Sequence, residues 1–162
     1  MNALSQNNLL DEFSRIRSWR KTICDYATTG CHVDLALEVE DLMPAVQLLF
    51  DDGYFLEDIT GVDLVEGIML VYHFDRYDVS LRVVLRMITP HEPRTAPSIS
   101  GIFSGADWHE RECFDFFGVV FENHPNLKPL LLPDDLGTHP LVKQSGRRPF
   151  YSLIPLRQTV DG

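Results

Sequence analysis

Three strand-like segments follow one another in the middle of the chain, at residues 55–63, 68–75 and 79–88. The loops between them are short, which favours antiparallel pairing of neighbouring strands. Residues 19–26 and 31–39 read as two more strands, joined by the hairpin-like turn Ala27-Thr28-Thr29-Gly30. These five strands predict one mixed, mostly antiparallel sheet.

Helical spacing of apolar residues marks two further segments. The first covers residues 9–18. The second begins at Glu40-Asp41 and ends at Gly53, and its apolar stripe consists of Leu42, Val46, Leu49 and Phe50. A breaker over residues 90–97 and short helical pieces follow the last strand. This order of elements predicts an α+β fold with helices packed on one face of the sheet.

Side chains alternate along two of the strands. In residues 31–39 every second side chain is apolar, as a half-buried strand requires. In residues 79–88 one face is apolar and the other carries Arg82 and Arg86. Either these arginines are solvated, or they bind an acidic residue of the helix at residues 108–117 or of a neighbouring subunit, since arginine suits interface ion pairs.

Charge and hydrophobicity exclude several classes of function. A net charge of −10 disfavours nucleic acids and anionic membrane surfaces, because both bind basic protein surfaces. No stretch approaches the roughly 20 apolar residues of a membrane-spanning helix, and residues 1–8 are polar without a signal sequence. We therefore expect a cytoplasmic protein that reaches a membrane only through partners.

Cysteine and histidine spacing indicates no metal or redox site. The three cysteines form no Cys-x-x-Cys pair, so we expect small buried apolar residues, with Cys24 and Cys31 able to face each other across the turn. The six histidines show no ligand spacing, and there is no nucleophile elbow, phosphate loop or dinucleotide fingerprint. We predict no active site, metal or cofactor on this chain.

The helix at residues 108–117 mixes charges with large aromatic side chains. On a helical wheel Glu110 lies in the apolar arc, where a carboxylate must find a donor or stay protonated. Leaving Trp108 in water would forgo burial worth roughly 1.5–3 kcal/mol. Both faces are therefore predicted contact faces, and the outer one carries Trp108, Arg111, Glu112 and Asp115. The simpler alternative is an amphipathic helix with an Arg111–Asp115 ion pair.

The residues from this helix onward resemble the signature of the 30 kDa subunit family of respiratory complex I, which includes the matching subunit of membrane-bound [NiFe] hydrogenases. The pattern is met by Glu110-Arg111-Glu112, Asp115, Phe116-Phe117, His124, Lys128 and Leu130-Leu131. Further similarity lies in Asp58-Ile59-Thr60-Gly61-Val62-Asp63, Leu81-Arg82-Val83 and His139-Pro140-Leu141. The resemblance covers roughly residues 30–143.

The resemblance implies a cofactor-free accessory subunit that braces partners during electron transfer. Those partners would be a hydrogenase-like large (49 kDa-type) subunit and iron–sulfur subunits, which carry the clusters. The residues predicted to form the subunit interface are Trp108, Glu110, Arg111, Glu112, Asp115, His124, Lys128 and His139. Replacing Arg111 by alanine is predicted to abolish co-purification with the partner and to leave the melting temperature of the isolated fold nearly unchanged.

Residues 122–162 are punctuated by proline, so a continuous helix is not expected there. They are nevertheless too rich in leucine and aromatic residues for a solvated tail. We predict an α+β domain over residues 1–121 and an extended arm over residues 122–162, whose apolar groups pack on another protein or, in the weaker alternative, on their own domain. Unpaired sheet edges would favour self-association in isolation.

The sequence departs from the complex I pattern after His139-Pro140-Leu141. Members of the family usually continue there with a basic pair and then Asp-Phe/Tyr-Pro, whereas this chain has Val142-Lys143-Gln144-Ser145-Gly146-Arg147-Arg148-Pro149. This departure keeps open a membrane-bound [NiFe] hydrogenase and a ferredoxin- or F420-linked complex. A second alternative, from another class, is a small stand-alone enzyme that uses His124 or Glu110 as acid–base. It requires a pocket and a shifted pKa at these side chains.

Overall fold

The expected sheet is present in the computed structural model, which describes residues 13–144 and 146–153. Its strands are β1 (Arg20–Ile23), β2 (Val33–Leu37), β3 (Phe55–Asp63), β4 (Ile68–Asp75) and β5 (Val83–Thr89). They lie in the order β1-β2-β5-β4-β3; the β2–β5 pair is parallel and the other three pairs are antiparallel. The predicted mixed, mostly antiparallel α+β fold is confirmed.

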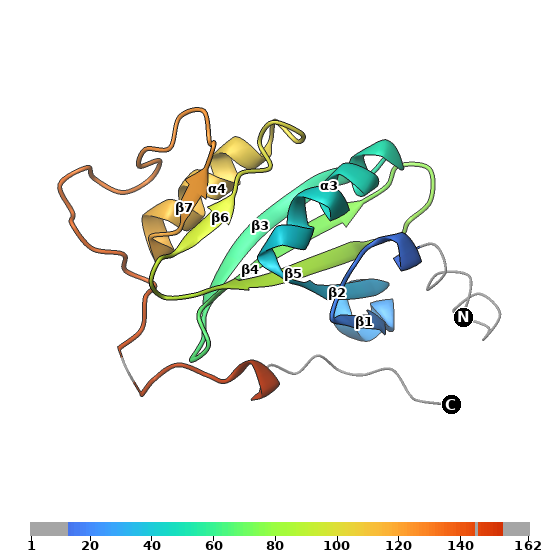
Figure 1. The fold of residues 1–162 in the computed structure, drawn as a ribbon, viewed down its shortest axis with the longest axis horizontal. Helices are drawn as coiled ribbons and strands as arrows, with labels where there is room; N and C mark the ends of the chain where they lie inside the picture. The colour runs from blue at the N-terminus through green and yellow to red at the C-terminus, as the bar shows by residue number, and fades with distance from the viewer. Residues whose placement is uncertain (1–12, 145, 154–162) are drawn as a thin grey trace.

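Helix α3 (Leu42–Asp51) lies across one face of the sheet (Figure 1), after the short 3-10 turn η2 (Val39–Asp41). Its stripe residues Leu42, Val46 and Leu49 are buried in the main core, whereas Phe50 is exposed. Burial of each leucine contributes roughly 1.5–3 kcal/mol. Apolar contact therefore holds this helix to the sheet.

The first strands differ in detail from the prediction. The turn between β1 and β2 is a one-turn helix, α2 (Tyr26–Thr29), because the Asp25 side chain caps its start and Gly30 ends it with a φ of 75°. The first predicted helix is not found over residues 13–18, which contain only the 3-10 turn η1 (Phe13–Arg15). Residues 9–12 lie outside the described part of the chain.

Strand β5 begins four residues later than expected. Asp75 accepts a hydrogen bond from the Leu81 backbone N–H at 3.0 Å, so the preceding residues follow the β4–β5 loop instead of the ladder. Val79, expected on the apolar core face, is exposed there. The Asp75 carboxylate at the end of β4 thus holds the residues just before β5 in the loop.

A small second sheet was not anticipated. Strands β6 (Thr95–Pro97) and β7 (Val120–Glu122) pair in parallel, and helix α4 (Ala106–Phe117) lies between them in sequence. The Thr89 hydroxyl donates to the Thr95 carbonyl and accepts from its N–H, which fixes the start of β6. This unit lies at one end of the large sheet (Figure 1).

The second face of the large sheet is also covered. A separate apolar cluster lies there, formed by Cys24, Cys31, Leu64, Met69, Val71 and Val84. Tyr151, from the C-terminal 3-10 turn η3 (Tyr151–Leu153), packs against it. The expectation of a half-buried β2 is wrong, because all five of its residues are buried.

Arg86 of β5 and Arg82, the residue just before this strand, bind acids within the sheet. Arg86 Nε donates to Asp34 Oδ2 at 2.6 Å, and Arg82 Nη2 donates to Glu57 Oε1 at 2.7 Å. Free solvation and a bond to an acid of the helix at residues 108–117 are therefore both wrong, because carboxylates of β2 and β3 bind these arginines instead. A contact with a neighbouring subunit stays a prediction.

Candidate interaction site

Helix α4 is fixed to the sheet by close packing of its inner face. Cys113 and Phe117 are buried in the main core, as expected. A Cβ added at Gly61 of β3 would lie 2.5 Å from the Phe117 ring, so only glycine permits this approach. Gly118 ends the helix with a φ of 70°. The helix that carries most of the predicted site residues therefore has a defined orientation.

Glu110 has no exposed surface, and its carboxylate is bound from two directions. The Ser98 hydroxyl donates to Oε2 at 2.6 Å and the Ile99 backbone N–H donates to Oε1 at 2.7 Å. Burial raises the pKa of Glu110 to about 7, although these two hydrogen bonds favour its charged form. The predicted need for donors is met within the chain, and Glu110 joins α4 to the loop after β6.

His124 lies beside this carboxylate, with 3.8 Å between its Nε2 and Glu110 Oε2. The Asn126 backbone N–H donates to His124 Nδ1 at 3.0 Å, so Nε2 carries the ring proton and points at the Asp107 carbonyl, 3.2 Å away. This histidine thereby ties the first residues after β7 to helix α4.

The arm covers part of the outer face of α4. Asp115, expected to be free for a partner, is buried, and its Oδ2 accepts backbone N–H groups of Leu130, Leu131 and Leu132 at 2.9, 2.7 and 3.1 Å. That expectation is wrong, because a helical wheel does not show which later segment folds back over a face.

Arg111 takes part in the same contact. Its Nε donates to the Lys128 carbonyl at 3.0 Å and its Nη2 to the Pro129 carbonyl at 3.1 Å. Its nearest carboxylate is Asp107, at 3.7 Å, and not Asp115 as predicted. The guanidinium therefore holds the arm, so the expectation that Arg111→Ala leaves the isolated fold unchanged does not fit this geometry.

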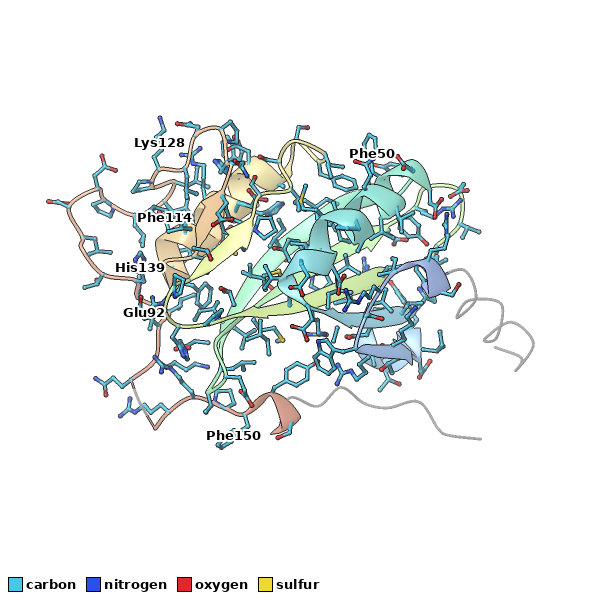
Figure 2. The ribbon with its side chains drawn as sticks, in the orientation of Figure 1. Phe50, Glu92, Phe114, Lys128, His139 and Phe150 are labelled. Carbon is cyan, nitrogen blue, oxygen red and sulfur yellow. The ribbon has the colours of Figure 1, made fainter. Side chains whose placement is uncertain are left out.

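His139 contacts the C-terminal end of helix α4. Its Nδ1 lies 2.9 Å from the Asp115 carbonyl oxygen, and its ring lies against that of Phe114 (Figure 2). A Cβ added at Gly118 would lie 2.5 Å from the His139 ring. The end of α4 and the His139-Pro140-Leu141 segment therefore fit together directly.

Asp63, at the end of β3, anchors the last part of the arm. It is buried and accepts bonds from the Lys143 backbone N–H (2.6 Å) and Arg148 Nε (3.0 Å), with His91 Nε2 at 2.9 Å. Burial alone would raise the pKa of Asp63, but the hydrogen bonds from His91, Lys143 and Arg148 outweigh it and lower the pKa. Asp63 belongs to the segment at residues 58–63 that resembles the family, but no pattern in the sequence indicated that it binds the arm.

Asp63→Asn should loosen the end of the arm without unfolding the sheet. The neutral side chain loses the charge-assisted bond from Arg148, worth about 1.5–3 kcal/mol. Amide hydrogen exchange at Lys143 and Val65, whose N–H donates to the Pro149 carbonyl, should become faster. Asp78→Asn, at an exposed acid of the β4–β5 loop, is the control. Unchanged exchange at both amides would refute the anchoring role.

Several predicted residues remain on the outside. Trp108 is 66% exposed and Glu112 is exposed, while Lys128 extends away from the body of the molecule (Figure 2). The arm adds exposed apolar side chains at Leu131, Leu136, Leu141 and Phe150. Whether these residues meet a partner stays a prediction. Part of the arm follows the weaker alternative, since Leu127 and Tyr151 pack on their own domain. Packing on another protein stays a prediction.

The stand-alone enzyme finds little support here. Glu110 has the shifted pKa that it requires, but the side chains of Glu110 and His124 have no exposed surface that a substrate could reach. Within residues 13–144 and 146–153, no cluster of three or more His, Cys, Asp or Glu side chains could hold a metal ion. No helix in that part of the chain is long and apolar enough to span a bilayer.

The fold and the bound arm define a small α+β domain whose charged signature residues organise a C-terminal extension. A family model for the 30 kDa subunit of respiratory-chain NADH dehydrogenase matches residues 35–149. The chain therefore belongs to the complex I 30 kDa subunit family, as its resemblance to that signature predicted.

Individual relatives support this family assignment. An NADH-quinone oxidoreductase subunit of Roseiflexus sp. (strain RS-1) is 37% identical over 120 residues, or 68% of each chain. The corresponding protein of Nocardioides sp. (strain ATCC BAA-499 / JS614) is 36% identical over 119 residues, which are 66% of this chain and 46% of the relative. This chain thus matches about half of that longer protein.

Two solved structures share the fold. The trypsin-resistant Nqo5 fragment (1–134) is 27% identical, with a TM-score of 0.50 over 59% of this chain and 82% of the fragment. A chain of the membrane-bound sulfane sulfur reductase, an archaeal respiratory membrane complex, has a TM-score of 0.73 over 85% of this chain and 82% of its own, at 19% identity. The second likeness concerns the fold alone.

Proposed function

We propose that this chain is a scaffold subunit in the peripheral arm of an NADH:quinone oxidoreductase-type complex, where it braces the hydrogenase-like large subunit and the iron–sulfur subunits. The observation that carries the proposal is the anchored arm. Arg111, Asp115 and Asp63 hold it in place, while it presents exposed leucines to the outside. An extended segment held in this way is preorganised for binding, which reduces the entropy lost on assembly.

The proposed contribution to electron transfer is geometric. The chain carries no cofactor of its own in this proposal, and the iron–sulfur clusters belong to partner subunits. In this proposal the chain lies on the cytoplasmic side of the membrane and reaches the membrane through those partner subunits. The equivalent position in a membrane-bound [NiFe] hydrogenase or a ferredoxin- or F420-linked complex is the alternative, which the departure over residues 142–149 keeps open.

Affinity purification of the tagged full chain from solubilised membranes of its own organism tests the proposal. We expect a large hydrogenase-like subunit and iron–sulfur subunits among the proteins identified by mass spectrometry. Leu131→Asp should strongly reduce their recovery, because it places a charge on the exposed apolar surface of the arm. Val79→Asp is the matched control, since Val79 is similarly exposed (52% against 62%) on the β4–β5 loop. Purification of the chain without such subunits would refute the proposal.

A further inference from the structure

A groove of about 270 Å³ lies between strand β3 and helix α4. Its floor includes Gly61 and Cys113, Phe116 forms part of its helical wall, and Leu141 of the arm adds a further apolar side. The Leu141 backbone N–H donates to the Phe116 carbonyl at 3.1 Å, so this part of the arm is attached directly to the groove. Small-molecule pockets usually exceed about 300 Å³, so the groove suits a single inserted side chain better than a cofactor.

Two carboxylates lie in the lining of this mostly apolar groove, Asp58 from β3 and Glu112 from α4, and no lining residue is basic. A register shift in β3 between Leu56 and Asp58 changes the direction of the strand just before this point. Asp58 is 42% exposed at its side chain and contacts His109 Nδ1 at 3.2 Å. Glu112 is exposed and has no hydrogen-bond or ion-pair partner among the described residues.

The geometry points to this groove as the receptor for one lysine or arginine side chain of a partner subunit. The aliphatic stem of such a residue would pack against Phe116 and Leu141, while its cationic end would lie between Asp58 and Glu112. Long basic side chains bury their stems on apolar surface in this way. The net charge of −10 also favours a basic partner surface, because the electrostatic potentials of two binding surfaces are usually complementary. The inference rests on the proposed function and adds the chemistry of the contact.

The test uses the tagged full chain bound to its membrane partners, with their recovery measured at increasing salt. Neutralising both acids with Asp58→Asn and Glu112→Gln should lower the affinity about tenfold at low salt and flatten the dependence on salt. Leu141→Trp, which fills the groove and keeps both carboxylates, should also reduce recovery. Glu38→Gln with Glu40→Gln, at two exposed acids before α3, is the control. Thermal melting of each variant establishes that it is folded.

The outcomes separate this inference from the proposed function. If the wild-type chain recovers its partners and both groove variants recover them equally well with unchanged salt dependence, the groove is not the contact and the scaffold role stands. If the control pair weakens binding as much as the groove pair, general acidity is responsible and the inference fails. If the wild-type chain recovers no partner, both proposals fail.

Discussion

Replacing Asp115 by alanine should release the arm from helix α4. One carboxylate oxygen accepts three successive backbone N–H groups, and the substitution leaves all three without an acceptor. Hydrogen bonds to a charged group contribute about 1.5–3 kcal/mol each when measured singly, and bonds that share one oxygen are not additive. We therefore expect a loss of about 3 kcal/mol in the stability of the arm contact, while the five-stranded sheet stays folded.

Limited digestion with chymotrypsin measures this release. Cleavage after Leu131, whose backbone N–H donates to Asp115 in the folded chain, should become much faster in the variant. Glu112→Ala is the matched control on the same helix, because Glu112 is exposed. Asp115→Asn, which keeps an acceptor oxygen but loses the charge, should give an intermediate rate. Equal cleavage rates in wild type and Asp115→Ala would contradict the anchoring role of this carboxylate.

Substituting glutamine for Glu110 should change how the stability of the protein depends on pH. Burial raises the pKa of Glu110 from its ordinary value of 4.5 to about 7 in the folded chain. Between these values the folded state holds the proton and the unfolded state does not, so stability falls as the pH rises, by up to about 1.4 kcal/mol per pH unit. Below pH 4.5 this contribution is fully present, and above about pH 7 it is lost.

The glutamine side chain at position 110 does not titrate, so the variant lacks this pH-dependent contribution to stability. Relative to wild type, the variant should be least stable at about pH 4.5 and below. Its stability relative to wild type should then increase up to about pH 7 and stay constant above that value. Urea unfolding of both proteins across this range measures the difference. Glu112→Gln, at an exposed acid of the same helix, is the control. A flat result for Glu110→Gln would show that Glu110 titrates normally.

The large sheet was predictable because its strands are continuous and their loops are short. Strands β3 and β4 lie where the alternation and the turns placed them, at Phe55–Asp63 and Ile68–Asp75. Strands β6 and β7 were missed because each has three residues, too few for a period of two to be recognised. The β2–β5 pairing joins segments separated by 45 or more residues, and no local pattern encodes such a choice.

The site was predictable in its residues but only partly in their roles. The wheel placed Glu110 correctly in the interior and required donors for it, and the structure supplies them from Ser98 and Ile99. It placed Asp115 outside, because periodicity identifies the faces of a helix and not what covers them. One signal was present in the sequence: Pro129 and Pro133 enclose three leucines whose backbone N–H groups need an acceptor.

The anchors of the arm also set an order of events during synthesis. Asp63 is made 80 residues before Lys143 and 85 residues before Arg148, so its partners emerge from the ribosome long after the sheet residues. Domains fold as units in the order in which they are synthesised. The arm thus takes up its final arrangement only after Lys143 and Arg148 have been synthesised. A nascent chain that has not yet reached these residues therefore lacks the contacts that fix the arm to Asp63.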